Sequence, residues 1–501
     1  MLDNSAILCA FPDQYFKSIS NFDSALLQEL ILRQKQIFLA LNKPVFYEKE
    51  TDELCQHLTE KQESARLNAK GIVAIFQQNP DIEHLVLFSN FTPFFDTKLF
   101  TELAQIHSQY AAEFTHGENI PSGIMPVIIN RSAIEVLQEL VEPEQLDEQK
   151  ISLQSFILKN INKFAVESHF VLPDLRLLRL DYSCISFRSM VETRDLLGSL
   201  SQENENVIEN LNTALEKNPA LLFNNPSFIQ LELTKETFRK FKYAGPTNEK
   251  AEATLSSTNW QSVMNLLSDL ETEFSVEFAG PGEPLLHPEI LNISKELLKE
   301  EKLEKLFITT SVPDTGKLLE IVQADTENKV VLIIECNGTE SFDSLYELDT
   351  YEDFKKRLQE FVSNLNEVQK TRVYLQTLKM IDNEKDIDEL YELADTLGIQ
   401  YLLQKYNSFS GQLPERRVSD MTPLKRSFCW HLRRDIVIKA DGTVPFCKQD
   451  CLASEPRGNL KEKKGIALWA SQREHWIKNY GENLSISSFC SSCDEYYTFN
   501  A

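Results

Sequence analysis

The chain has 501 residues, of which 42% are hydrophobic and 25% charged, the composition of an ordinary soluble globular protein. Its net charge of −25 at pH 7 argues against nucleic acid, which is bound through basic surfaces, and against an anionic membrane surface. No apolar run approaches the ~18 residues that span a bilayer, and the N-terminus lacks the basic start of a signal peptide. We therefore expect a cytoplasmic protein, in which clustered cysteines bind metal rather than form disulfides.

Residues 1–195 alternate strand-like and helix-like segments. The predicted strands are Ala6–Phe11, Pro44–Tyr47 and His84–Phe88, and the predicted helices are Ser24–Leu41, one or two within Asp52–Gln78, and Asp96–Tyr110. This alternation predicts an α/β domain with a mainly parallel sheet and helices on its faces. A polar segment rich in Asn and Glu, with a helix over Ser201–Lys217, then predicts a linker at residues 196–225.

The segments 85–96 and 118–123 resemble nucleotide-sugar and cytidylyl transferases. In that family a strand ends in Asp-x-Pro-Leu-x-Asp, and the first Asp binds the metal of the nucleotide phosphates. Here Phe91 stands at that position, and the loop after the first strand, residues 11–18, contains no glycine. Without an oxygen ligand Mg²⁺ has no anchor, and without glycine the backbone cannot close on a phosphate. The resemblance therefore implies a degenerate scaffold, and a working transferase is the alternative.

Residues 226–425 contain six strand–helix repeats. The predicted strands are Phe228–Leu233, Ser275–Phe278, Lys305–Thr309, Val330–Glu335, Arg372–Thr377 and Gln400–Lys405. The predicted helices are Asn259–Glu273, Pro288–Glu301, Gly316–Gln323, Tyr351–Val368 and Lys385–Leu397. Six such units predict a (β/α)6 partial barrel that binds ligands at the carboxyl ends of its strands.

The Gly-Glu-Pro sequence at 282–284 resembles a motif of radical S-adenosylmethionine (radical SAM) enzymes. The resemblance implies that Gly282 and Glu283 bind the amino group of S-adenosylmethionine. The alternative for Glu283 is a carboxylate kept for folding. The family also carries C-x3-C-x2-C after the first strand, to hold a 4Fe–4S cluster. In this chain Thr237, Phe241 and Ala244 occupy those three positions, so the barrel resembles one that has lost its cluster.

Four of the nine cysteines form two pairs near the C-terminus. Cys429 precedes a strand-like run, Asp435–Lys439, and the dipeptide Asp441-Gly442 follows it. Asp-Gly between two apolar runs is typical of a hairpin, which would bring Cys447 back beside Cys429. The second pair is a C-x2-C at 490–493, a spacing that lets two thiolates face one metal.

These cysteines, with Gly458-Asn459-Leu460 and Leu468-Trp469 between the pairs, resemble the SPASM/twitch auxiliary-cluster domain of radical SAM proteins. The whole chain resembles the spirochaete-restricted spiro-SPASM proteins. The resemblance implies a metal domain over residues 426–501 in which one 4Fe–4S cluster is held by Cys429, Cys447, Cys490 and Cys493. Cys451 falls outside the family's pairing and is expected to be a bystander. A four-cysteine zinc site is the alternative.

Together these features predict an iron–sulfur protein with no assigned catalytic residue. It would serve as a scaffold for a protein or peptide partner, or in electron transfer. Two alternatives remain open: an enzyme of unrecognised chemistry that binds S-adenosylmethionine or another small ligand at the barrel mouth, and a zinc protein. A radical SAM enzyme with a relocated cluster is disfavoured, because no spare group of cysteines exists to hold it.

We predict that the protein forms no 5′-deoxyadenosine from S-adenosylmethionine and a strong reductant. Thr237, Phe241 and Ala244 offer no thiolate to hold a cluster, so no electron reaches the sulfonium by this route. The measurement is chromatography of the reaction mixture against a protein-free control. Product above that control, lost when Glu283 is changed, would contradict the prediction.

Overall fold

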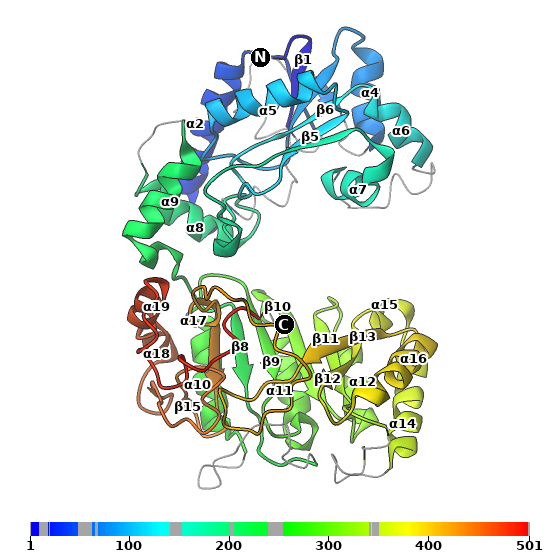
Figure 1. The fold of residues 1–501 in the computed structure, drawn as a ribbon, viewed down its shortest axis with the longest axis vertical. Coiled ribbons are helices and arrows are strands. Elements are labelled where there is room, and N and C mark those ends of the chain that lie inside the picture. Colours follow the sequence, from blue (N-terminus) through cyan, green and yellow to red (C-terminus); the bar gives the residue numbers. More distant parts are fainter. Residues whose placement is uncertain are drawn as a thin grey trace. The chain divides into compact units, whose positions relative to one another are not determined.

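The computed structural model of the chain divides into two compact units, Met1–Leu222 and Phe223–Ala501 (Figure 1). Each unit is built on one seven-stranded sheet. No helix in the part of the chain that the structure describes is both long and apolar enough to cross a membrane. The described residues are 2–9, 19, 21–48, 63–65, 69–140, 153–200, 205–238, 254–339, 342 and 350–498.

Unit 1 has the strand order β3-β2-β1-β4-β6-β5-β7. The strands are β1 (Ser5–Cys9), β2 (Val45–Glu48), β3 (Glu63–Ala65), β4 (His84–Phe88), β5 (Phe114–Gly117), β6 (Val127–Asn130) and β7 (Val166–His169). Only β6 runs antiparallel to its neighbours, β4 and β5. The helices are α2 (Ser24–Leu41), α4 (Ala69–Gln78), α5 (Thr97–Gln109), α6 (Ala133–Leu140), α7 (Leu153–Lys159), α8 (Phe187–Leu197) and α9 (Val207–Lys217).

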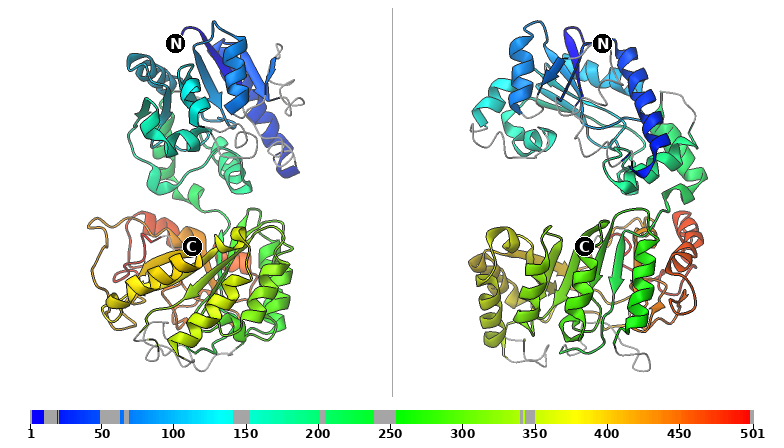
Figure 2. Two further views of the ribbon diagram at one scale, coloured as in Figure 1. Left: turned by 90° about the vertical axis from the view of Figure 1, so that its right-hand side faces the viewer. Right: turned by 180° about the vertical axis from the view of Figure 1, so that it is seen from behind.

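Helices cover both faces of the unit 1 sheet, because successive strand residues point to opposite faces (Figure 2). On one face Ile7 of β1 and Phe88 of β4 pack against α2 and α5. On the other face Leu8 and Leu87 pack against α4 and α6. The predicted α/β class is therefore confirmed for this unit, with a mixed rather than a fully parallel sheet.

One segment prediction in unit 1 is corrected. The stretch predicted as helix, 52–78, contains β3, which pairs in parallel with β2, and only α4 is helical among its described residues. The helix predicted over 201–217 is present as α9, which lies within unit 1. The carboxylate of Asp96 explains this, since it accepts the N–H groups of Leu99 in α5 and of Val207 at the start of α9, at 2.9 and 2.8 Å.

Unit 2 has the strand order β13-β12-β11-β10-β9-β8-β14, with every pairing parallel. The strands are β8 (Phe228–Leu231), β9 (Phe274–Phe278), β10 (Leu303–Thr310), β11 (Val330–Glu335), β12 (Val373–Lys379), β13 (Gln400–Lys405) and β14 (Asp435–Ile438). The helices of the repeats are α10 (Ser257–Ser268), α11 (Ile290–Leu297), α12 (Thr315–Ala324), α14 (Tyr351–Ser363), α15 (Glu367–Lys370) and α16 (Ile387–Leu397). All six predicted strands are present, and the helix predicted over 351–368 is divided where Asn366 caps α15.

The seventh strand adds a pairing that was not predicted. β14 pairs with β8 in parallel, with Asp435 opposite Phe228 and Ile438 opposite Leu231. The predicted hairpin also forms, since the N–H of Lys439 donates to Thr443 O at 2.9 Å and, within the turn, the N–H of Gly442 donates to Lys439 O at 2.8 Å. Beyond the turn, β15 (Thr443–Val444) pairs with β16 (Gly458–Asn459). The apolar side chains of β14 pack in the barrel core, and this packing stabilises its pairing with β8.

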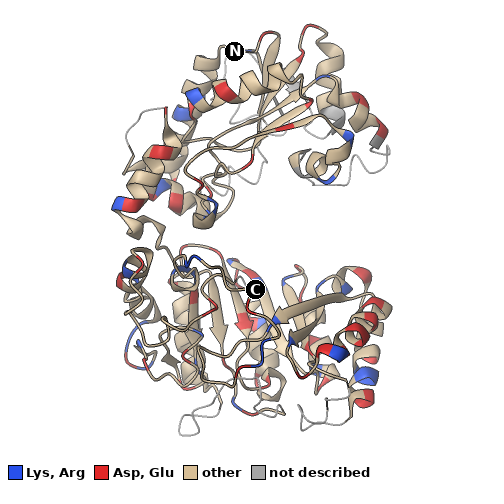
Figure 3. Cartoon of the chain, viewed as in Figure 1, with Lys and Arg blue, Asp and Glu red and all other residues tan. Residues whose placement is uncertain are grey.

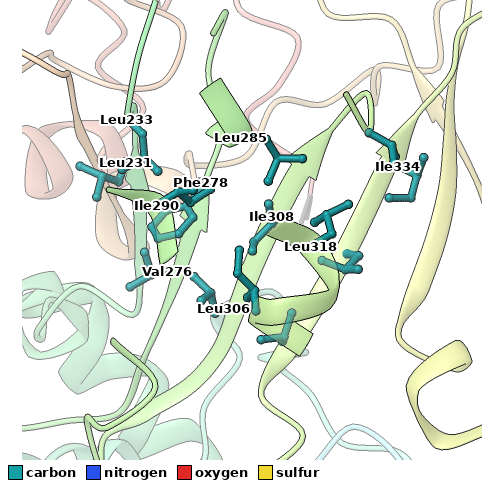
Figure 4. Packing of buried hydrophobic residues seen from close by; sticks show 14 of the residues in the cluster. Leu231, Leu233, Val276, Phe278, Leu285, Ile290, Leu306, Ile308, Leu318 and Ile334 are labelled. Atoms are coloured by element: carbon teal, nitrogen blue, oxygen red, sulfur yellow. The ribbon is translucent and has the colours of Figure 1, made fainter. Parts of the chain in front are cut away.

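That core joins the barrel to the C-terminal segment. Alternate strand residues, including Leu231, Phe278 and Ile308, pack against Ile290 of α11 and Leu318 of α12 (Figure 4). The same cluster contains Ile436, Ile438, Val444, Leu468 and Trp469. The remaining helices of this segment are α17 (His431–Arg434), α18 (Gly465–Ala470) and α19 (Arg473–Tyr480). Apolar residues between Ile436 and Trp469 therefore share one core with the barrel.

Acidic side chains are prominent on the outer helices of unit 2 (Figure 3). Helix α16 carries Asp388, Glu389, Glu392 and Asp395 and no basic residue. Its buried face is formed by Leu390, Leu393 and Ala394. The acidic groups thus form the solvated side of an amphipathic helix.

A buried histidine pair lies within unit 1. His107 is 1% exposed; its Nε2 lies 3.1 Å from His84 Nδ1, and its Nδ1 lies 2.7 Å from Thr115 Oγ1. Burial, and then the neighbouring His84, lower the pKa of His107 to about 4. The neutral form is therefore the one that the folded protein accommodates.

We predict that the unfolding free energy falls as the pH is lowered from about 6.5 toward 4. The unfolded chain protonates His107 near its ordinary pKa of about 6.5, whereas the folded chain resists protonation until the lower pKa, so the stabilisation present above pH 6.5 is lost over this window. Urea titrations across this range measure the effect. His107→Gln should flatten the pH dependence, and His169→Gln, a half-buried histidine of β7, should not. Equal pH profiles for wild type and His107→Gln would contradict this account.

Candidate metal centre and barrel cavity

Three separate segments bring four cysteines to one small cavity. Cys429 lies just before α17, Cys447 lies after β15, and the remaining two come from the C-x2-C pair at 490–493. All four line this cavity, which also contains Arg426, Leu432, Phe446 and Phe489. The structure therefore brings together the four cysteines that the sequence singled out.

The four thiols influence one another's ionisation. Burial, and then the charge of Cys493, raise the pKa of Cys429 to about 12. The same two causes, in the same order, raise the pKa of Cys447 well above its usual value and that of Cys490 to about 11. Four thiolates gathered in a buried cavity repel one another and need a cationic centre to be stable.

Backbone N–H groups point at these sulfurs. The N–H of Glu495 donates to Cys493 Sγ at 3.4 Å. Backbone hydrogen bonds at Leu432 and Gln449 lower the pKa of Cys429 and Cys447, against the larger effect of burial. Hydrogen bonds of this kind stabilise negative charge on sulfur, and in iron–sulfur proteins they help to set the reduction potential.

Cys451 lies outside this group. Its Sγ donates to Lys448 O at 3.8 Å, and it lines the barrel cavity rather than the cavity of the four thiols. Burial raises the pKa of Cys451 to about 12, with further effects from Lys439 and Asp450 but from no other cysteine. The structure thus separates the fifth C-terminal cysteine from the other four.

The four thiols are not arranged around a single point. Among the residues that the structure describes, no group of three or more His, Cys, Asp or Glu side chains could hold a metal ion. A tetrahedral zinc site with Zn–S bonds of about 2.3 Å requires its sulfurs to lie roughly 3.8 Å apart.

Charged side chains fix the last residues of the described chain onto the barrel. Lys405, at the end of β13, donates to the backbone O and the Oδ2 of Asp494, each at 2.9 Å, and lies 2.9 Å from Glu495 Oε1. His431 Nδ1 lies 2.6 Å from Asp435 Oδ2, and its Nε2 lies 3.0 Å from Glu495 O. The C-x2-C pair is therefore held in place by both β13 and β14.

A second, larger cavity of about 210 Å³ lies inside the barrel. Every strand of the sheet contributes to its lining, with side chains that alternate with the apolar ones of the core. These side chains are mostly polar: Gln230, Glu232, Glu277, Thr309, Glu335, Gln376, Gln404, Asp435 and Lys439. Cys447 and Lys448 line both cavities, so one loop separates the candidate metal centre from the barrel interior.

Glu277 in β9 is the functional candidate that sequence analysis missed. Its side chain lines the barrel cavity and is 8% exposed. Burial raises its pKa to about 7, and the charge of Lys448 opposes that rise. The sequence did contain a signal, because Glu277 is a carboxylate within a mostly apolar, buried strand. It lies opposite Gln230 of the neighbouring strand, and both side chains line the cavity.

Glu283 and Gly282 have structural contacts. Glu283 is 1% exposed; its Oε1 accepts the hydroxyl of Thr310 at 2.6 Å, and its Oε2 accepts the N–H of Ser311 at 2.8 Å. It also caps η5 (Pro284–Leu286). A Cβ added at Gly282 would stand 1.7 Å from Thr234 O, so the backbones of two segments meet here. Neither residue lines the barrel cavity, although Gly280 and Pro281 do.

The structure describes only some of the positions at which this chain differs from the family motifs. Thr237 is half-buried after β8, whereas Phe241 and Ala244 lie outside the described residues. In unit 1 Phe91 is fully buried in a core cluster with Phe88 and Phe95. An aromatic core residue therefore occupies the place where the transferase resemblance requires a metal ligand, while the loop at 11–18 lies outside the described residues.

The fold defines a mixed α/β protein of two units, each with one large sheet. The sequence matches no known family model. It is 24% identical to an uncharacterized protein of Treponema pallidum (strain Nichols) over 359 residues, which covers 69% of this chain and 97% of that protein.

Three solved structures illustrate the structural similarities. BtrN in complex with AdoMet and 2-DOIA is 14% identical with a TM-score of 0.37, covering 54% of this chain and 97% of that one. Streptococcus suis SuiB bound to the precursor peptide SuiA is 15% identical with a TM-score of 0.41, and the match covers 62% of this chain and 82% of that one. A cytidylyltransferase from Leptospira borgpetersenii serovar Hardjo-bovis is 13% identical with a TM-score of 0.35, and the match covers 44% of this chain and 97% of that one. At TM-scores this low, the residues of this chain must carry the functional argument.

We predict that Gly282→Ala strongly destabilises unit 2, by several kcal/mol or to the point of misfolding. The new Cβ would overlap Thr234 O, a main-chain atom that cannot rotate away. Thermal and urea unfolding of the full chain measure the effect. Gly481→Ala is the matched control, because a Cβ there meets its nearest atom at 3.5 Å. Equal stability of the two variants would contradict the close approach at Gly282.

Proposed function

We propose that the protein binds one 4Fe–4S cluster through Cys429, Cys447, Cys490 and Cys493. The observation that carries this proposal is the convergence of these thiols, from three separate segments, on one buried cavity that excludes Cys451. When bound, such a cluster supplies one-electron redox chemistry or structural cross-linking. Four thiolates leave no iron open to a substrate, which favours a structural or electron-transfer role over catalysis.

A cavity lined by four cysteines suits a cluster as the proposed occupant. All four cysteines line the same cavity. A 4Fe–4S cluster separates its ligand sulfurs by its own width, so it suits thiols that surround a cavity rather than a point. Zinc remains the alternative that metal analysis distinguishes.

The surroundings suit an anionic cluster. Backbone N–H groups, including that of Glu495, donate to the sulfurs, and Arg426 donates to Cys493 O at 3.0 Å while stacking over the Tyr496 ring. Lys448 adds a second positive charge at the loop between the two cavities. These groups hold and orient the ligand segments and offset negative charge in a buried site.

Binding of the cluster is expected to be coupled to completion of the barrel. Cys429 and Cys447 flank β14, which is a strand of the barrel sheet, and the C-x2-C pair is tied to β13 through Lys405. The cluster would therefore cross-link both edges of the sheet, and metal-binding energy would contribute to folding of the whole unit.

Ligand binding inside the barrel is the second candidate function. The cavity of about 210 Å³, lined by polar side chains of every strand, favours it. S-adenosylmethionine is one candidate ligand through its proposed contacts with Gly282 and Glu283, and the cavity begins at the neighbouring Gly280 and Pro281. A protein or peptide partner for the scaffold role remains a proposal.

We predict that replacing any one of the four proposed ligands with Ala lowers the iron content of anaerobically purified protein by at least half. Three thiolates cannot saturate the cluster, and the remaining buried thiols repel one another. Cys451→Ser is the matched control and should retain wild-type iron, because Cys451 lines the other cavity. Iron analysis and the visible absorbance of the cluster are the measurements. Loss of iron in Cys451→Ser, or its retention in Cys447→Ala, would show that the ligand set is wrong.

A further inference from the structure

The buried carboxylates of the barrel cavity differ in how their charges are compensated. Glu232 Oε2 lies 3.1 Å from Lys439 Nζ, and Asp435 pairs with both His431 and Arg434. Asp450 is fully buried and accepts backbone N–H groups of the following turn, at 2.7 and 3.0 Å. The negative charges of these three carboxylates are therefore stabilised by groups of the protein itself.

Glu277 has neutral partners. Its Oε2 accepts from Gln230 Nε2 at 3.1 Å, and its Oε1 accepts weakly from Thr309 Oγ1 at 3.4 Å. Within the described residues no Lys, Arg or His forms an ion pair with it. Two charged groups act on it from a distance: Lys448, which favours the carboxylate, and Asp435, which disfavours it.

A buried carboxylate without a cation is costly, and the cost is removed when a cation arrives. Glu277 faces an open cavity, so such a cation can come from a ligand. The elements packed around it leave that side free, since β8 and β10 contribute only the amide of Gln230 and the hydroxyl of Thr309. Gln230 and Thr309 donate to Glu277, and their side-chain oxygens can in turn accept from a ligand. An ammonium group, which only donates, therefore suits this position.

The rest of the cavity indicates the size and chemistry of the ligand. At about 210 Å³ the cavity is smaller than the ~300–1,000 Å³ of typical small-molecule sites, which favours a ligand of amino-acid or diamine size. Gln376 and Gln404 line it with amide groups that form no side-chain hydrogen bond among the described residues. Lys448 Nζ lies 4.0 Å from Glu495 Oε2. Lys448 also lines the cavity, where its positive charge can attract a polar or anionic end of the ligand.

We propose that the barrel cavity binds a small amino-bearing ligand, an amino acid or a diamine, whose ammonium group is received by Glu277. This inference rests on the ligand-binding function proposed above for the cavity. Glu277 is the specificity-determining residue, and the amides of Gln230, Gln376 and Gln404 supply the remaining polar contacts.

Isothermal titration calorimetry of the full chain with 1,4-diaminobutane tests the proposal, with 1,4-butanediol as the neutral analogue of equal length. Moderate salt suppresses loose association with the acidic surface. Wild type should bind the diamine saturably and the diol not at all. Glu277→Gln should weaken diamine binding by about tenfold or more, because the isosteric amide removes the charge. Glu277→Asp, which keeps the charge, should retain part of the affinity, and Glu301→Gln, at an exposed position, should retain all of it.

The outcomes separate the two levels of the proposal. Equal diamine affinity in wild type and Glu277→Gln, with both proteins folded by circular dichroism, would overturn the role of Glu277 and leave a ligand-binding cavity. If neither the diamine, L-lysine nor S-adenosylmethionine binds to wild type, both the cavity function and the inference are wrong. Wild type and variants are compared at equal iron content, because Cys447 and Lys448 line both cavities.

Discussion

The parallel pairing of β14 with β8 is the constraint on which both sites in unit 2 depend. It adds a seventh strand to the barrel sheet and places Ile436 and Ile438 in the barrel core. It also fixes the positions of the cysteines on either side, Cys429 before the strand and Cys447 after it. A one-residue slip in this register would turn the apolar side chains of β14 into the cavity and its polar ones into the core. The segment that carries the proposed metal centre is therefore part of the barrel structure.

The loop from Phe446 to Cys451 links the two sites chemically. Cys447 and Lys448 line both the thiol cavity and the barrel cavity. A change of charge at the metal centre would act on Lys448 and, through it, on Glu277, whose pKa depends partly on that lysine. The arrangement connects a buried, titratable carboxylate to a potential redox centre across one short loop, which gives a structural basis for coupling between ligand binding and cluster charge.

Much of the local structure could be predicted from the sequence, and most errors concern long-range pairing. Helix α2 and strands β4, β11 and β13 have the predicted bounds, because their apolar spacing fixes both type and length. The Asp-Gly turn correctly predicts the local hairpin. The pairing of β14 with β8 could not be predicted, because β8 lies about 200 residues earlier in the chain. The four cysteines could be predicted from their spacing. Glu277 could not, because its role depends on neighbours from three strands, and only the structure shows that these leave its charge uncompensated.

The most direct test of the central claim is the metal and sulfide content of the full chain purified without oxygen. If the four cysteines hold a 4Fe–4S cluster, the protein should contain about four irons and four acid-labile sulfides per chain and little zinc. One zinc per chain with no acid-labile sulfide would contradict the account and establish the zinc site in its place.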